Sequence, residues 1–254
     1  MRTGGPIATI ATGLGVAILT ISSANAASQG FSGWAAVIIS GDNEAAHVDK
    51  STEAFDNARR DLGRALEHRG FSAANLAEFS VEPNRHPDTR PGPARLVDIA
   101  AGLRRLANQA PDGCLVYLTS HGSPDGAVLG EHLLSPRALA RLVGGACGRR
   151  PTIVVISACF SGVFVPALAG PHRLILTAAR RDRSSFGCGE SDEYPFFDGC
   201  VLENLSASAD FIDLAGRTRR CVAKRENFEH MSPPSEPQLS DGARFHSPAF
   251  SPPA

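Results

Sequence analysis

Three short apolar runs, separated by amphipathic stretches, constrain the fold of this chain more than any other feature of its sequence. The runs lie at 34–40, 114–119 and 152–157. Continuous apolar runs of this length are typical of strands that are buried on both faces of a parallel sheet. Segments 52–69 and 94–110 repeat apolar residues at helical spacing. The alternation predicts an α/β fold in which helices flank a mostly parallel sheet.

The remaining segments divide the chain into parts. Further strands are expected at 76–81 and 172–179, and further helices at 196–205, at 210–224 and from Ser135-Pro136, where serine caps the first turn. Residues 34–227 form the predicted domain, after a signal peptide at 1–26 and a short linker at 27–33. Prolines crowd the following segment, which predicts a tail, 228–254, that either wraps the domain or stays flexible.

The first residues have the pattern of a secretory signal peptide. Arg2 is followed by an apolar, uncharged run at 7–21, and Ala24-Asn25-Ala26 fits a cleavage site after Ala26. The run is shorter than the roughly 20 residues that a membrane-spanning helix needs, so an uncleaved anchor is the weaker alternative. We therefore expect a secreted or periplasmic protein, without a stable membrane span after cleavage, in a compartment where disulfides persist.

Composition and missing motifs exclude several classes of function. The 254 residues carry 25 Lys+Arg against 26 Asp+Glu, so no basic excess is available to neutralise the phosphates of a nucleic acid. Aromatic residues make up only 6%, which leaves few surfaces on which bases could stack. The G-x-S-x-G, G-x4-G-K, H-E-x-x-H and C-x-x-C motifs are all absent from the sequence. The absence of the last two motifs argues against a zinc site and against thioredoxin-like redox chemistry.

Reactive side chains follow two of the predicted strands. His121 follows the strand at 114–119 and precedes Gly122, whereas Cys159 follows the strand at 152–157. The separation leaves room for a loop, a helix and a strand, which is the usual connection between parallel strands of one sheet. Since such strands end at the same edge, the imidazole and the thiol are expected to meet there and generate a thiolate nucleophile. A buried structural thiol and a loop histidine are the alternatives for each residue taken alone.

Three blocks of sequence surround these residues. They are Leu118-Thr-Ser-His121-Gly122, Ile156-Ser-Ala-Cys159-Phe-Ser-Gly162, and Leu176-Thr-Ala-Ala179 followed by Ser184-Ser-Phe-Gly-Cys188. Over about residues 34–205 the chain thereby resembles the legumain (asparaginyl endopeptidase) family of cysteine peptidases, whose wider group includes the caspases. The resemblance implies a caspase-like three-layer sandwich, a catalytic dyad of His121 and Cys159, and a peptide or protein substrate. It also implies an oxyanion hole formed by the N–H groups of Gly122 and Cys159, and no cofactor.

The resemblance departs from the family pattern around the specificity pocket. Legumains have an acid two residues before the cysteine, where this chain has Ser157, and an Arg-His pair after the first strand, where this chain offers only His47. Ser185 matches a pocket serine, and Asp198 matches a pocket acid after a two-residue shift. If Asp198 or Glu190 lines the pocket, a basic or amide side chain is expected before the cleaved bond. A helix cap is the alternative role for Asp198.

The other cysteines leave their pairing open. Cys114 opens a core strand and is expected to be a buried thiol. The other four, Cys147, Cys188, Cys200 and Cys221, allow three connectivities.

The leading functional hypothesis is a cysteine endopeptidase in which Cys159 attacks the scissile carbonyl and His121 transfers protons. The same dyad would serve a transpeptidase if an amine, rather than water, resolved the acyl-enzyme. A non-catalytic caspase-like binding module and a thiol redox protein are the alternatives of other classes. The sequence gives no oligomeric state.

Overall fold

The computed structural model of the chain describes residues 1–5, 30–46 and 49–252. The expected signal peptide falls largely in 6–29, and its cleavage site and His47 lie outside the described residues. Among the helices in the described part of the chain, none combines the length and the apolar character needed to cross a bilayer.

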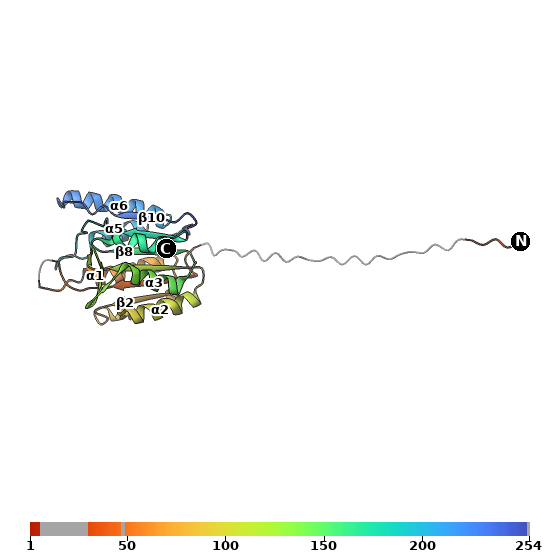
Figure 1. The fold of residues 1–254 in the computed structure, drawn as a ribbon, viewed down its shortest axis with the longest axis horizontal. Coiled ribbons are helices and arrows are strands. Elements are labelled where there is room, and N and C mark those ends of the chain that lie inside the picture. The colour runs from red at the N-terminus through yellow and green to blue at the C-terminus, as the bar shows by residue number, and fades with distance from the viewer. Residues whose placement is uncertain (6–29, 47–48, 253–254) are drawn as a thin grey trace.

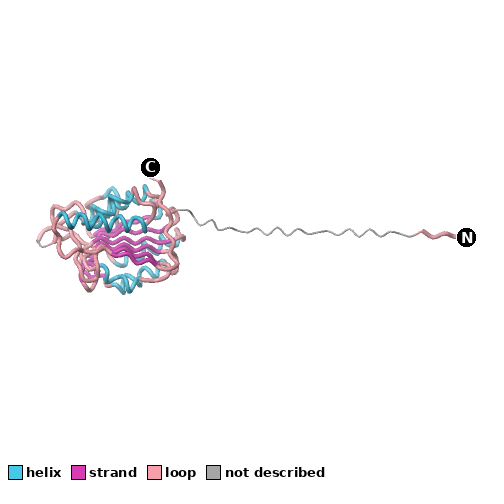
Figure 2. Tube along the Cα trace, turned by 90° about the horizontal axis from the view of Figure 1, so that it is seen from above, coloured by secondary structure: helices cyan, strands magenta, loops and turns pink. Residues whose placement is uncertain are grey.

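A seven-stranded sheet forms the middle layer of the fold, with strand order β10-β9-β8-β4-β1-β2-β3 (Figures 1 and 2). The strands are β1 Trp34–Ser40, β2 Leu76–Ser80, β3 Gly92–Pro93, β4 Gly113–Thr119, β8 Thr152–Ser157, β9 Arg173–Thr177 and β10 Gln238–Asp241. All pair in parallel except β10, which runs antiparallel to β9. Every residue of β1, β4 and β8 is buried, which explains why these strands appear in the sequence as unbroken apolar runs.

Helices cover both faces of this sheet (Figure 1). One face packs against α1 Ala54–His68, α5 Phe196–Leu205 and α6 Phe211–Phe228, and the other against α2 Leu96–Gln109, α3 Pro136–Cys147 and the short α4 Val165–Leu168. Three short 3-10 helices, η1 Ala73–Asn75, η2 Pro87–Thr89 and η3 Ser161–Phe164, complete the described helical elements. The predicted three-layer α/β fold is confirmed, and Ser135 caps α3 by accepting a hydrogen bond from the Ala138 N–H.

A small antiparallel sheet follows β4 and was not predicted from the sequence. Its strands are β5 Gly122–Ser123, β6 Gly126–Leu129 and β7 His132–Leu134. The strands are too short to leave a recognisable pattern, and the turns between them depend on Gly126 and Gly130, which both have positive φ. Because β5 starts directly after His121, this sheet fixes the path of the chain at the end of β4.

The proline-rich C-terminal segment packs on the domain, which is the wrapping alternative of the two that its sequence left open. Residues 238–241 form β10, whose register pairs Leu239 with Leu176 of β9. Farther along, Phe245 and Phe250 are buried in the core on the α1–α5–α6 side, where the Phe250 ring lies 5.2 Å from that of Phe31. The alternation of proline with isolated apolar residues hid these contacts from a search for regular periodicity.

Two disulfides link helices to the rest of the core. Cys114, at the start of β4, is joined to Cys147, at the end of α3, and Cys200 of α5 is joined to Cys221 of α6. The expectation of a free thiol at Cys114 was wrong, because the end of α3 brings the two Cα atoms to 6.2 Å. Of the described cysteines, Cys159 and Cys188 are unpaired.

Candidate active site

The ends of β4 and β8 bring the two predicted catalytic residues to one edge of the sheet. The two strands are parallel neighbours, and Thr119 pairs with Ser157 at their carboxyl ends. The Ser120 N–H donates to the carbonyl of Ser157 at 3.0 Å, which extends the pairing beyond the strands. His121 and Cys159 each follow two residues after one member of the pair, so they leave the sheet at the same level.

The two strand ends approach each other closely at Gly122. A Cβ atom at this position would lie 2.2 Å from the carbonyl oxygen of Cys159 and 3.0 Å from the Cβ of Ala158. No side chain fits in that space, so glycine is needed for steric reasons. The backbone of Gly122 therefore lies against the carbonyl group of Cys159.

His121 is held by a carbonyl group and an aromatic ring. Its Nε2 lies 3.0 Å from the carbonyl oxygen of Glu44, and the ring of Phe55 meets it edge to face with centroids 5.0 Å apart. Because a carbonyl oxygen only accepts hydrogen bonds, Nε2 carries the proton and Nδ1 of the neutral ring is an acceptor. The turn that presents Glu44 is itself fixed, since Oδ1 of the buried Asp42 accepts from the N–H groups of Asn43 and Glu44 at 2.8 and 3.1 Å.

The half-buried thiol of Cys159 contacts one of the predicted pocket residues. The Ser185 N–H donates to Sγ at 3.2 Å, and the hydroxyl of Ser185 lies 3.6 Å from the same sulfur. Ser185 belongs to the loop after β9, the strand that neighbours β8. The structure thus brings Ser185 into contact with the thiol of Cys159.

The turn that carries Cys159 is sharp and strained. Phe160 adopts the left-handed conformation, with φ 56° and ψ 13°, which is unfavourable for a residue with a side chain. Two hydrogen bonds hold the turn: the Phe160 N–H donates to the Arg183 carbonyl at 2.8 Å, and the Ala179 N–H donates to the Ser161 hydroxyl at 3.0 Å. Contacts to the loop after β9 therefore help to fix the position of Cys159.

A second thiol lies at the site, and sequence reasoning treated it only as a candidate for a disulfide. Cys188 Sγ is 3.9 Å from Nδ1 of His121. Burial, and secondarily the nearby Cys159 and Asp192, raises the pKa of the Cys188 thiol to about 12. Cys188 consequently stays protonated near neutral pH and is a poor nucleophile there. Its spacing after Ser185 in the third sequence block was the signal that could have placed it here.

Of the two predicted pocket acids, one is buried in the core and the other lies on the surface. Asp198 is completely buried beneath the sheet end, so the prediction that it lines a substrate pocket is wrong. It does not cap α5 either, because the first turn of that helix has no side-chain cap. Glu190 is more than half exposed and pairs with Lys50 at 2.7 Å.

Hydroxyl groups from two strands surround the buried carboxyl group of Asp198. Tyr117 donates to Oδ1 at 2.5 Å, whereas Thr119 and Ser157 donate to Oδ2 at 2.6 and 2.9 Å. Burial raises the pKa of Asp198 to about 6, although the three hydrogen bonds act in the opposite direction. The same burial, together with the adjacent carboxyl group, raises the pKa of Tyr117.

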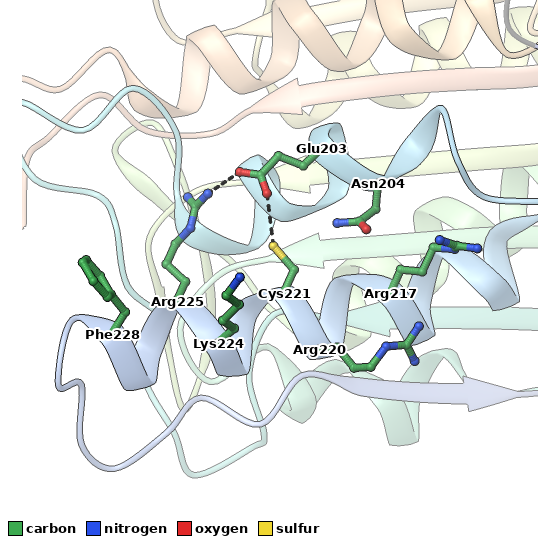
Figure 3. A pocket seen from close by; sticks show the side chains of 8 residues that line it. All are labelled: Glu203, Asn204, Arg217, Arg220, Cys221, Lys224, Arg225 and Phe228. Atoms are coloured by element: carbon green, nitrogen blue, oxygen red, sulfur yellow. Dashed lines mark hydrogen bonds and ion pairs between the residues drawn. The ribbon is translucent and has the colours of Figure 1, made fainter.

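Two surface pockets lie away from these residues. One, of about 560 Å³, lies between α5 and α6 and is bordered by basic side chains such as Arg217 and Lys224 (Figure 3). Its Glu203 lies within 4.8 Å of the sulfurs of Cys200 and Cys221, but those sulfurs form a disulfide and offer no thiolate to a metal ion. The other pocket, of about 650 Å³, is mainly apolar and lies between the start of α2 and the β6–β7 hairpin.

Comparison with known proteins indicates the class of protein. The family model for the Peptidase C13 family matches residues 91–216, a range that contains His121 and Cys159. The structure is similar to the crystal structure of caspase-1 from Spodoptera frugiperda, with a TM-score of 0.60 at 16% sequence identity. That similarity covers 84% of this chain and 88% of the caspase chain. No curated protein matches the sequence.

The structural similarity shows a caspase-like fold. The family match indicates a cysteine-type peptidase, which acts on protein substrates. Within that class, residues 91–216 are most specifically similar to the Peptidase C13, or legumain, family.

Proposed function

We propose that the chain is a secreted or periplasmic endopeptidase that hydrolyses peptide bonds through Cys159 and His121. The observation that carries the proposal is the parallel pairing of β4 with β8, with Thr119 opposite Ser157. This register brings an imidazole and an unpaired, half-buried thiol to one sheet edge. Both residues also lie within the segment that matches a peptidase family.

The hydrogen bond between Nε2 of His121 and the Glu44 carbonyl puts the ring proton on Nε2, so that Nδ1 is the nitrogen that can act as the base. With Nε2 protonated, Nδ1 takes the proton of the Cys159 thiol, and the thiolate attacks the scissile carbonyl carbon. The N–H groups of Gly122 and Cys159 stabilise the oxyanion of the tetrahedral intermediate. Nδ1 then gives its proton to the leaving amine. Water, deprotonated by the same nitrogen, attacks the acyl carbon, the C–S bond breaks, and the proton returns from Nδ1 to Sγ of Cys159.

Secretion is supported by the disulfides as well as by the leader sequence. The bonds Cys114–Cys147 and Cys200–Cys221 are of the kind that persists in oxidising compartments and is rare in a reducing cytosol. We expect the exported protein to begin at Ala27, which N-terminal sequencing would show. Intact protein that keeps residues 1–26 and stays in the cell would contradict this part of the proposal.

The central test uses a peptide library with the mature protein and its Cys159→Ala variant. We expect the wild-type protein to cleave a subset of peptides and a peptide electrophile to form an adduct. Replacement of Cys159 should abolish both, because the other thiol at the site, Cys188, stays protonated. Mass mapping of the adduct should place it on Cys159. Cleavage by the Cys159→Ala variant, or an adduct on Cys188, would contradict the proposed nucleophile.

The same assay separates hydrolysis from transpeptidation. An added peptide amine should leave the products of a hydrolase unchanged, whereas a transpeptidase would join the amine to the acyl half of the substrate. Ligated product as the main species would replace the proposed hydrolysis by acyl transfer through the same residues.

A further inference from the structure

We infer that Asp198 is a positioning residue, which holds the ends of β4 and β8 together and thereby sets the relative position of His121 and Cys159. The inference rests on the proposed function, because it assigns Asp198 to the same site. Asp198 touches no substrate in this role, and it acts through the hydroxyl groups of the two strands.

The geometry of the hydrogen bonds links Asp198 to both strands at one point. A single carboxylate oxygen, Oδ2, accepts from the Thr119 hydroxyl of β4 and from the Ser157 hydroxyl of β8. Thr119 and Ser157 are direct partners across the sheet. Each precedes a proposed catalytic residue by two positions, so a shift of one strand end relative to the other would stretch one of these hydrogen bonds.

The choice of an acid at this place has a chemical reason. A carboxylate only accepts hydrogen bonds and has about four acceptor positions, so it can satisfy the hydroxyls of Tyr117, Thr119 and Ser157 together. An amide would place an N–H₂ group against one of these hydroxyls and force it to reverse its role. The three hydroxyls thus specify an acid, and α5 delivers it from the helix layer rather than from the strands themselves.

The burial of Asp198 also indicates more than a packing role. Among the described residues no arginine, lysine or histidine forms an ion pair with it. A fully buried carboxyl group without a cation destabilises a fold relative to an apolar side chain of similar size. Earlier in the two strands the partners on this side are Leu115 with Ile153 and Tyr117 with Val155. Neither pair gives Asp198 a hydroxyl from both strands, so Asp198 connects β4 to β8 only through Thr119 and Ser157.

The experiment compares the same substitution at two ends of the sheet. Thr119→Val removes the hydroxyl that binds Asp198, whereas Thr152→Val removes an equally buried hydroxyl at the start of β8, which binds the Arg150 carbonyl. Ser157→Ala and Asp198→Asn complete the set. For each variant, kcat and KM on a library-derived peptide, the alkylation rate of Cys159 mapped by mass spectrometry, and the urea midpoint are measured.

We expect Thr119→Val, Ser157→Ala and Asp198→Asn to lower kcat and the alkylation rate by about 10- to 100-fold, with KM changed by less than about threefold. The kcat of Thr152→Val should stay within about threefold of wild type, even if its urea midpoint falls as far as that of Thr119→Val. The double variant Thr119→Val/Ser157→Ala should lose less than the product of the single losses, because both hydroxyls bind one oxygen.

Three results would overturn the inference. They are full kcat in the folded Asp198→Asn variant, a kcat of Thr152→Val as low as that of Thr119→Val, or strictly multiplicative losses in the double variant. Failure of the proposed function looks different, because then the wild-type protein itself would neither cleave peptides nor react at Cys159, and the positioning role would be lost with it.

Discussion

The two faces of the central sheet are built from alternate residues of the same strands, yet they differ in chemistry. Toward α2 and α3, β4 presents Val116 and Leu118 to a core of apolar side chains. Toward α1, α5 and α6, the same strand presents Tyr117 and Thr119, which meet the buried carboxyl group of Asp198. The α2–α3 side is closed by apolar packing and the Cys114–Cys147 disulfide, whereas the other side places hydrogen bonds beneath the proposed catalytic residues.

This difference suggests a division of tasks. Apolar burial stabilises a fold but does not fix the relative orientation of the packed groups, because the hydrophobic effect is not directional. Hydrogen bonds to Oδ2 of Asp198 require defined positions of two hydroxyls, so they fix geometry at the cost of burying a polar group. We therefore expect substitutions on the α2–α3 side to change stability, and those on the Asp198 side to change catalysis.

The largest expected effect breaks the apolar side. Leu103 of α2 is completely buried in that core, so Leu103→Ala should lower the free energy of unfolding by about 2 to 5 kcal/mol. At urea concentrations below the midpoint of unfolding, the kcat of this variant should equal that of wild type. Urea denaturation and peptide cleavage at one temperature check both statements. A drop in kcat while the variant is still folded would show that the two faces are not separable.

The second prediction concerns the pH dependence of stability on the polar side. Burial raises the pKa of Asp198 from 3.8 to about 6, so the folded state binds more protons than the unfolded state between these values. Stability should therefore fall as pH rises through about 6, by up to about 3 kcal/mol. Urea unfolding from about pH 4 to about pH 8 measures this slope, and Asp198→Asn should lose it. Equal slopes in both proteins would refute the assignment.

The third prediction tests the edge where the polar side ends. Gly122→Ala would bring a Cβ to 2.2 Å from the Cys159 carbonyl, so the two strand ends must separate. The separation would displace His121 relative to Cys159, which should lower kcat by about 100-fold. Gly145→Ala in α3 is the matched control, because a Cβ added there would meet no atom within 4 Å. Steady-state kinetics should show wild-type kcat for the control, and an active Gly122→Ala variant would refute the close approach.

The sequence was sufficient for the main layers of the fold. Strands buried on both sides, such as β8, appear as uninterrupted apolar runs, and amphipathic helices such as α1 repeat at 3.6 residues. The sequence was insufficient for β10 and for the hairpins of β5–β7. Their residues form strands only because a neighbouring segment offers backbone hydrogen bonds. The partner of Cys114 was missed for the same reason, since disulfides join residues that only the fold brings together.

The candidate site was predictable where chemistry depends on strand ends and unpredictable where it depends on helix placement. His121 and Cys159 follow regular strands, so their common edge follows from parallel pairing. Asp198 lies on α5, and the sequence does not define which way this helix is rotated about its axis. The local match to a pocket acid therefore predicted a place in the substrate pocket, whereas Asp198 is buried. Cys188 lies in a loop without periodicity, and its contact with His121 depends on the path of that loop.

The position of β10 has a consequence for the order of synthesis. Both proposed catalytic residues leave the ribosome long before Gln238–Asp241, the strand that covers the open edge of β9. The loop after β9 holds the thiol of Cys159 through Ser185, so the site depends on a strand that is itself unsupported until the last part of the chain arrives. A nascent or truncated chain would thus carry the thiol of Cys159 while the strand behind the Ser185 loop still lacks its edge partner.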